Sequence, residues 1–184
     1  MVNVSNRHCH LHSDDMEKLF GKGHQLTPLK DLMQPGEHAC KETITISGNR
    51  RQIENVRVLG PLRKATQIEV SMTDSIHLGL NAPVRTSGDI AGSASVKVTG
   101  PAGTIELKEA CIVAKRHVHM TPADAEFFGL KDKETVSIRV EGERGLIFEN
   151  VTARVHPNMK LECHLDTDEA NAAGVKNGSQ AFIL

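Results

Sequence analysis

The stretch Arg7-His8-Cys9-His10 returns 109 residues later as Arg116-His117-Val118-His119, so the chain holds two copies of one His-x-His pair. Side chains at i and i+2 of an extended strand project from the same face, and each pair can therefore direct two imidazoles at one point. Asp15 recurs at the same offset as Asp124, in segments that begin like short helices. The duplication predicts a strand, a turn and a short helix that occur twice.

A second register relates the later parts of the two copies. Ile53-Glu54-Asn55-Val56 aligns with Phe148-Glu149-Asn150-Val151 at an offset of 95 residues, and the same offset places Glu69 on His164. It also aligns three further pairs: Gln67 with Glu162, Asp74 with Glu169, and Gly79 with Gly174. Two side chains that can bind metal, Glu69 and His164, therefore occupy equivalent places in the two copies.

Together the registers give each copy three metal ligands: His8, His10 and Glu69 in the first, and His117, His119 and His164 in the second. Catalytic zinc sites use such sets and leave a fourth position for water or substrate, whereas structural zinc is closed by four ligands, often cysteines. One His-x-His pair alone would fit a structural role as well as metal binding. The duplication favours metal, and we expect two Zn²⁺ ions, or another divalent metal such as cobalt.

Composition narrows the class of protein. The 22 basic and 23 acidic residues give a net charge of -1, which removes the attraction that nucleic-acid binders need, so no nucleic-acid partner is expected. The four cysteines are widely spaced, and no secretory signal or stretch of 18 apolar residues appears, so we expect a reduced, cytoplasmic protein without a membrane segment. Cys9 and Cys163 alternate with candidate ligands and are expected to pack in the interior.

Short strand-like runs separated by turn residues dominate the chain. They include separate runs over 104–107 and 110–114, and over 146–149 and 152–155. Short helices are expected near four segments: 13–21, 73–80, 121–129 and 167–174. We predict a mainly β fold of two small β-barrels, related by a pseudo-twofold internal repeat and capped by short α-helices. The predicted halves are 1–109 and 110–184.

Four strings carry a resemblance to a known family: Ser5-Asn6-Arg7-His8-Cys9-His10-Leu11, Gly60-Pro61-Leu62-Arg63-Lys64-Ala65-Thr66-Gln67-Ile68-Glu69, Arg116-His117-Val118-His119-Met120 and Cys163-His164-Leu165-Asp166-Thr167-Asp168-Glu169-Ala170-Asn171. Over essentially the whole chain the sequence resembles the PduL-type phosphotransacylases, or phosphate propanoyltransferases, of bacterial microcompartments that degrade propanediol. The resemblance implies reversible transfer of a propanoyl or acetyl group between coenzyme A and phosphate at a dinuclear zinc site. It also implies the same grouping of six ligands, and a first strand exchanged into the C-terminal barrel.

The resemblance assigns further residues. Arg63 matches the phosphate-contacting arginine of the family, and a guanidinium suits an anionic oxygen pair. Ser87, in the loop from Pro83 to Gly88, is as well explained by turn formation as by substrate contact. Contacts to coenzyme A are expected from six residues: Val4, Ser5, Asn6, Arg50, Arg57 and Asn171. Arg50 would more often lie in a solvated turn, and Arg7 and Arg116 are expected to brace the strands.

The expected partners are acyl-CoA and inorganic phosphate, with a homo-oligomeric assembly and a possible association with a microcompartment shell. Family members inside microcompartments often carry an N-terminal extension, whereas this chain reaches the first metal strand almost at Met1. The cytoplasm and the microcompartment lumen therefore both stay open as locations. The preferred acyl chain also stays open, because a pocket that admits propanoyl would accept acetyl at a modest energetic penalty.

For the mechanism we expect phosphate, clamped by Arg63, to attack the thioester directly while a zinc ion polarises the carbonyl. Phosphate is already anionic near neutral pH, so no acyl-enzyme or dedicated base is needed. Two alternatives remain: a zinc hydrolase of thioesters or phosphoesters, and a non-catalytic metal-binding module. Release of CoA thiol that requires phosphate or arsenate would separate the transferase from the hydrolase.

Overall fold

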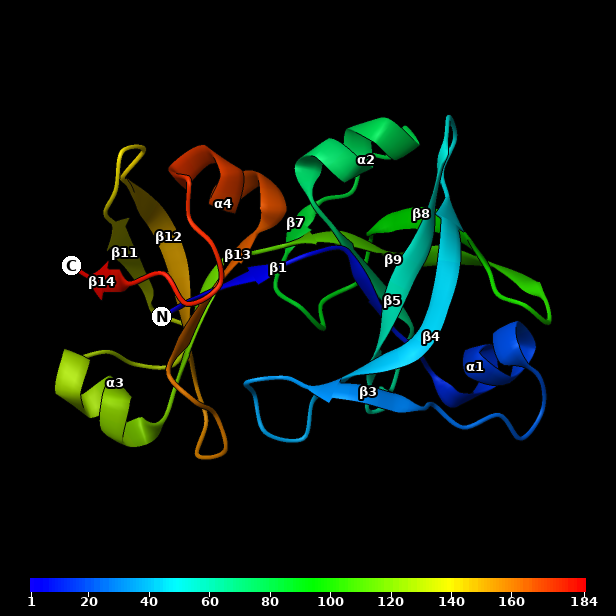
Figure 1. Ribbon diagram of the computed structural model, residues 1–184, viewed down its shortest axis with the longest axis horizontal. Coiled ribbons are helices and arrows are strands. Elements are labelled where there is room, and N and C mark those ends of the chain that lie inside the picture. Colours follow the sequence, from blue (N-terminus) through cyan, green and yellow to red (C-terminus); the bar gives the residue numbers. More distant parts are fainter. The chain divides into compact units, whose positions relative to one another are not determined.

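The computed structural model describes residues 1–184 and shows a mainly β chain with four short helices (Figure 1). The chain divides into two compact units. The N-terminal unit comprises Arg7–Leu32 and Gly36–Ala114, and the C-terminal unit comprises Met1–Asn6, Met33–Pro35 and Lys115–Leu184. The division falls after Ala114, and two short segments from early in the sequence belong to the C-terminal unit.

The N-terminal unit is a closed barrel. Its elements are β2 (His8–His10), α1 (Ser13–Phe20), β3 (Pro28–Asp31), β4 (His38–Ser47), β5 (Gln52–Gly60), β6 (Gln67–Val70), α2 (Met72–Leu78), β7 (Val84–Arg85), β8 (Ala94–Thr99) and β9 (Thr104–Ala114). Strand pairing runs β4-β5-β2-β6-β9-β8 and returns from β8 to β4, so six strands close on themselves. β3 pairs with β4 and β7 pairs with β9 outside this ring. Closure leaves these six strands without an open edge.

The C-terminal unit is a curled six-stranded sheet. Its elements are β1 (Val2–Ser5), β10 (His117–Met120), α3 (Pro122–Phe128), β11 (Thr135–Val140), β12 (Leu146–Val155), β13 (Glu162–Asp166), α4 (Thr167–Ala173) and β14 (Ala181–Ile183). The strand order is β1-β13-β10-β12-β11-β14, and β1 lies parallel to β13 at one end (Figure 1). The sheet forms a half-barrel. The first strand of the chain is therefore an edge strand of this unit.

Aliphatic side chains fill the inner face of each sheet, as the absence of Trp and Tyr requires. Cys9, Ile68 and Cys111 belong to the core of the N-terminal unit, and Val118 and Cys163 belong to that of the C-terminal unit. Each of the strands β2, β6, β10 and β13 thus sends alternate residues inward. The candidate ligands on the same strands face away from the cores because side chains alternate along a strand.

The internal repeat is present in the strand pairing. β2 lies parallel to β5 and antiparallel to β6, and β10 lies parallel to β12 and antiparallel to β13. His8 lies opposite Glu69 in one unit, and His117 lies opposite His164 in the other. The offsets of 109 and 95 residues in the sequence therefore describe one structural motif that is built twice.

Both copies continue into a short helix with matching ends. Ser71 caps α2 and Asp166 caps α4, and each helix ends at a glycine in the left-handed region, Gly79 at φ 72° and Gly174 at φ 65°. Such positions favour glycine because it has no Cβ. The duplicated sequence signals therefore mark real helix boundaries.

An ion pair ties each helix to the residue just before the strand that carries the two candidate histidine ligands. Arg7 Nε lies 2.8 Å from Asp74 Oδ2, and Arg116 Nη1 lies 2.8 Å from Glu169 Oε1. These pairs are equivalent in the repeat. Arg7 and Arg116 therefore brace the strands, as expected.

The predicted mainly β fold with two small barrels and short helices is confirmed. The four predicted helices are present, but two predicted strand breaks are wrong. β9 and β12 are each continuous, and the pairing registers shift beside the supposed breaks instead. In β12 Asn150 adopts a left-handed conformation at φ 56°, as Asn55 does in β5 at φ 57°. A bulge takes up the irregular residue without ending the strand.

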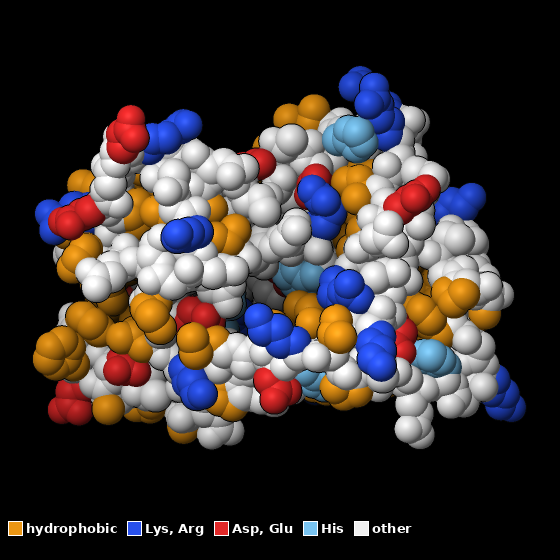
Figure 2. Space-filling model, viewed as in Figure 1, with side chains coloured by type: hydrophobic (Ala, Val, Ile, Leu, Met, Phe, Trp, Pro, Cys, Tyr) orange, Lys and Arg blue, Asp and Glu red, His pale blue; other side chains and the backbone are white.

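No helix in the structure is long and apolar enough to cross a membrane. On the face in view in Figure 2, acidic and basic side chains are interspersed, in keeping with the net charge of -1.

Candidate metal centres and their surroundings

The first cluster lies in the N-terminal unit. His8 and His10 come from β2, and Glu69 comes from the neighbouring strand β6. One potential ligand atom from each side chain lies within 4.8 Å of those of the other two, and all three residues are buried. His8 Nε2 and Glu69 Oε2 are 3.5 Å apart. The antiparallel register of β2 and β6 therefore brings Glu69 to His8 and His10, from which it is far away in the sequence.

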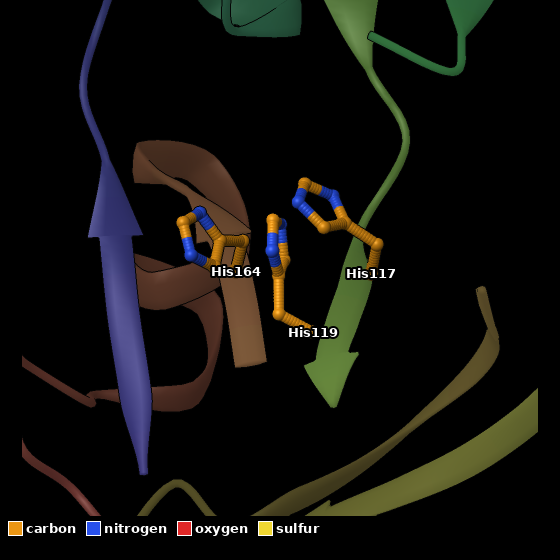
Figure 3. Close-up of side chains that lie close together, drawn as sticks. All are labelled: His117, His119 and His164. Carbon is orange, nitrogen blue, oxygen red and sulfur yellow. The ribbon is translucent and has the colours of Figure 1, made fainter. Parts of the chain in front are cut away.

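The second cluster lies in the C-terminal unit. His117 and His119 come from β10, and His164 comes from β13. Their ligand atoms also lie within 4.8 Å of one another. Figure 3 shows the three imidazoles side by side, with ring centroids 4.7 to 4.8 Å apart. Both ligand sets expected from the sequence are thus spatial clusters.

The surroundings favour the protonation states that metal binding needs. Burial, followed by the nearby His8 and Arg63, lowers the pKa of His10 to about 3. Burial, followed by the nearby His117 and His164, lowers the pKa of His119 to about 2. Burial alone would raise the pKa of Glu69, but the charge and hydrogen bond of His8 hold it well below its usual range. The neutral imidazoles of His10 and His119 and the ionised carboxylate of Glu69 are the forms that coordinate metals.

The hydrogen-bond pattern also fits a metal in each cluster. His10 Nδ1 and His119 Nδ1 are buried atoms without a hydrogen-bond partner, and they are equivalent in the repeat. Buried polar atoms in folded proteins are nearly always satisfied, and a metal ion would supply the missing partner. His117 Nδ1 lies 2.8 Å from the Lys115 carbonyl oxygen, which leaves Nε2 of this ring for a metal.

Arg63 lies beside the N-terminal cluster on the loop between β5 and β6. Its backbone N–H donates to the Leu11 carbonyl at 2.8 Å, which fixes the loop against the end of β2. Its guanidinium donates through Nη1 to Ser87 Oγ at 3.3 Å and pairs through Nη2 with Glu37 Oε1 at 3.1 Å. The side chain is about one-third exposed, so it remains accessible to a ligand.

Ser87 connects Arg63 to the cluster. Its hydroxyl donates to Glu69 Oε1 at 2.6 Å while it accepts from Arg63 and from Gln67 Nε2 at 3.0 Å. Gln67 Nε2 also lies 2.6 Å from Glu69 Oε1, and Gln67 Oε1 accepts from the Gly88 N–H at 2.8 Å. Ser87 therefore contacts a candidate ligand directly. From the sequence alone, a turn-forming role and a substrate-contacting role were equally well supported.

Two residues of this network, Gln67 and Glu37, were not singled out from the sequence. Gln67 carried a signal, because it aligns with Glu162 in the second register and lies two residues before a ligand. Glu37 follows Gly36 in an irregular segment and carried no comparable signal.

The residues expected to contact coenzyme A lie in both units. In the N-terminal unit Arg57 lies on β5 opposite His8, and its guanidinium donates to the Cys40 and Lys41 carbonyls at 3.0 and 2.8 Å. Arg50 is an exposed residue of the turn before β5. The two arginines are therefore separated along the strand by roughly 20 Å.

The other expected contacts belong to the C-terminal unit. Val4 and Ser5 are half-buried in β1, Asn6 is exposed just after it, and Asn171 is exposed on α4. Val4 pairs with Leu165, close to the three-histidine cluster in sequence. These residues are placed, but no contact among them selects a ligand.

Each unit thus carries three metal-type ligands and no fourth, which defines the class: a β protein with the ligand inventory of catalytic rather than structural metal sites. Comparison with known proteins defines it further. The phosphate propanoyltransferase family profile matches residues 1–176. The chain is 52% identical to the phosphate propanoyltransferase of Thermotoga maritima, covering 100% of this chain and 88% of that protein. The corresponding enzymes of Clostridioides difficile and Lachnoclostridium phytofermentans are 51% and 54% identical, each over 100% of this chain and over 88% and 86% of their own.

The chain belongs to the phosphate propanoyltransferase family of acyltransferases. The family expected from the sequence motifs is therefore confirmed.

Proposed function

We propose that this chain catalyses the reversible reaction of acyl-CoA with inorganic phosphate to give acyl phosphate and free CoA, with one Zn²⁺ in each of the two clusters. The observation that carries the proposal is the connection between Arg63 and the N-terminal cluster through Ser87. A cation that can hold phosphate is thereby attached to a set of three metal ligands. Family membership supplies the reaction class.

Arg63 suits the binding of phosphate. A guanidinium has five N–H donors in a planar fork. Its hydrogen bonds to Ser87 and Glu37 use two of them, so three remain for an incoming anion. The same two bonds hold the fork in place before phosphate arrives, which lowers the entropic cost of binding.

Neither Ser87 nor a cysteine is suited to form an acyl-enzyme. Ser87 donates its hydrogen bond to Glu69, which is a weak base because its pKa lies well below its usual range and which is itself a proposed metal ligand. All four cysteines are buried, and burial raises the pKa of Cys111 and of Cys163 to about 12. Direct attack follows: a phosphate oxygen forms a bond to the thioester carbonyl carbon, the carbon–sulfur bond breaks, and the thiolate leaves as CoA.

Zinc, when bound, would polarise the thioester carbonyl and stabilise the charge that develops on oxygen and sulfur. The residues that would hold it are His8, His10 and Glu69 in one unit, and His117, His119 and His164 in the other. Cobalt substitution tests whether the two ions act as a pair, because ions roughly 4 Å apart, as in two-metal enzymes, couple magnetically.

We extend the proposal to the substrates and their setting. Propanoyl and acetyl are the acyl groups proposed. The contacts to CoA are proposed to come from Val4, Ser5, Asn6, Arg50, Arg57 and Asn171. A homo-oligomer in the cytoplasm or in a microcompartment lumen, with possible shell association, completes the proposal.

The test combines zinc analysis of purified protein with release of CoA from propanoyl-CoA. Thiol release is followed with a chromogenic disulfide reagent. The four cysteines of the protein are buried and therefore shielded from this reagent. We expect two zinc ions per chain and thiol release that requires phosphate or arsenate. Release without either anion would identify a thioesterase, and two bound metals without any turnover would identify a non-catalytic module; both results would overturn the proposal.

A further inference from the structure

Glu162 is a buried carboxylate beside the three-histidine cluster, and the proposed reaction does not use it. It lies on β13, two residues before His164, and is only 3% exposed. Oε2 lies 2.8 Å from His164 Nε2 and accepts from Gln34 Nε2 at 2.9 Å, while Oε1 accepts from Asn3 Nδ2 at 2.9 Å. Three polar side chains therefore hold one carboxylate in a fixed orientation.

The supports of Glu162 are themselves anchored. Asn3 lies on β1 directly opposite His164. The Gln34 amide bonds both backbone groups of Lys160, donating to its carbonyl and accepting from its N–H at 3.1 Å each. These bonds attach the segment Met33–Pro35 to the C-terminal unit, of which it is a part. A segment far away in the sequence thus serves to hold this carboxylate.

The repeat shows that the contact between Glu162 and His164 has a counterpart. The equivalent pair in the N-terminal unit is Gln67 and Glu69, whose Nε2 and Oε1 atoms are 2.6 Å apart. In both units the residue two positions before the third ligand hydrogen-bonds that ligand. The polarity is reversed, because an amide donates to a carboxylate ligand in one unit and a carboxylate accepts from an imidazole ligand in the other.

This bond determines which nitrogen of His164 faces a metal. With Nε2–H donating to Glu162, the unprotonated nitrogen of the neutral ring is Nδ1. His117 is oriented the opposite way, because its Nδ1 lies against the Lys115 carbonyl. The two rings therefore present different nitrogens, one set by a backbone group and the other by Glu162.

We propose that Glu162 is a positioning residue that holds His164 in the tautomer and orientation for metal binding through Nδ1, with Asn3 and Gln34 keeping the carboxylate in place. The inference rests on the proposed binding of zinc by the three-histidine cluster. A carboxylate behind a histidine ligand fixes the ring and raises its basicity, and loss of such a partner typically lowers metal affinity about 10- to 100-fold.

The first experiment needs no variant. In zinc-loaded protein labelled with ¹⁵N-histidine, ring nitrogen shifts distinguish the coordinated nitrogen from the protonated one, and His164 is assigned by its absence from the spectrum of His164→Ala. Coordination through Nδ1, with a proton on Nε2, is expected. Coordination through Nε2 would overturn the proposal.

The second experiment measures the zinc affinity of each site by competition with a chelator in Glu162→Gln. An amide carries no charge and therefore supports the imidazole less strongly than the carboxylate, and its NH2 group faces the Asn3 amide, which must turn in order to accept. We expect one site to weaken about 10- to 100-fold while the other keeps its affinity. The double variant Asn3→Asp with Glu162→Gln lets the new amide donate to a carboxylate at position 3, and should recover most of the loss. Failure to recover would exclude a role in orientation.

Glu149→Gln is the matched control, because it makes the same chemical change in the same unit on an exposed side chain that bonds only Ser137. Unfolding of the metal-free variants by urea reports any general loss of structure. Wild-type protein that binds no zinc would refute the proposed function itself. Two zinc ions bound with unchanged affinities in Glu162→Gln would refute only the role of Glu162.

Discussion

Replacing Arg63 with alanine should weaken the use of phosphate while leaving both metals in place. The side chain contacts Ser87 and Glu37 but none of the six candidate ligands directly. Its removal leaves the Ser87 hydroxyl bonded to Glu69 and to Gln67, so the N-terminal cluster keeps its own hydrogen bonds. The variant is therefore expected to be defective in its use of phosphate and to keep its metal content.

The size of the effect follows from the free donors of the guanidinium. Three N–H groups remain after the bonds to Ser87 and Glu37, and a planar fork can direct two of them at two phosphate oxygens. Each hydrogen bond to a charged group contributes about 1.5 to 3 kcal/mol, so alanine should lose about 3 to 6 kcal/mol, or roughly 10²- to 10⁴-fold in kcat/KM for phosphate. Arg63→Lys keeps the charge but not the fork, and should lose roughly half of that free energy.

The assay varies phosphate at saturating propanoyl-CoA and follows CoA thiol, with zinc measured on the same samples. A rise in KM with kcat preserved would show that the lost contact holds phosphate in the ground state, whereas a fall in kcat would show a contact made in the transition state. Wild-type phosphate kinetics in Arg63→Ala would refute the assignment. Loss of zinc from the same variant would refute the argument that Arg63 acts on substrate and not on the cluster.

Three further predictions concern the clusters and their supports. Glu69→Ala and His164→Ala should each remove one of two zinc ions and most activity, and a zinc content of two per chain in either variant would contradict that ligand assignment. Arg116→Met breaks the ion pair between the metal strand and α4 and should cost about 1 to 3 kcal/mol in urea unfolding; an unchanged midpoint would exclude the bracing role. The free energy of unfolding of the metal-free protein should fall by about 2 kcal/mol as the pH falls from about 6.5 to about 5.5. The reason is that two imidazoles take up protons near pH 6.5 in the unfolded chain but stay neutral in the folded protein. Burial keeps His10 and His119 neutral in the folded state, with pKa values of about 3 and about 2, so pH-independent unfolding would refute that environment.

The metal-type ligands could be predicted from the sequence because they lie in regular structure. His8 and His10 share a face by strand alternation, and the second register supplied Glu69 without any knowledge of strand pairing. The structure shows why the repeat was sufficient: β2 and β10 are related by the offset of 109 residues, and their antiparallel partners β6 and β13 are related by the offset of 95 that aligns Glu69 with His164. Periodicity and duplication thus predicted that these side chains cluster.

The residues that support the ligands could be predicted only in part. Glu37 and Gln34 come from the irregular stretch between β3 and β4, one beside Arg63 and the other beside Glu162. Such contacts depend on how a loop packs, and neither strand alternation nor the repeat constrains them. The joining of β9 and of β12 into single strands was missed for a related reason, because a bulge and a break leave similar marks in a sequence.

The two clusters differ in where they carry negative charge. Each cluster has one buried carboxylate on the strand that supplies its third candidate ligand. Glu69 is itself that candidate ligand, whereas Glu162 lies two residues before His164 and hydrogen-bonds its ring. A metal held by two imidazoles and a carboxylate has part of its charge neutralised by direct coordination, while one held by three imidazoles meets the carboxylate only through a ring. The N-terminal cluster also has the guanidinium of Arg63 close by, with its own partner Glu37. The two clusters thus occupy equivalent strand positions, while an amide–carboxylate pair in one and a carboxylate–imidazole pair in the other make them electrostatically different. That difference would favour an anion such as phosphate at the cluster with Arg63.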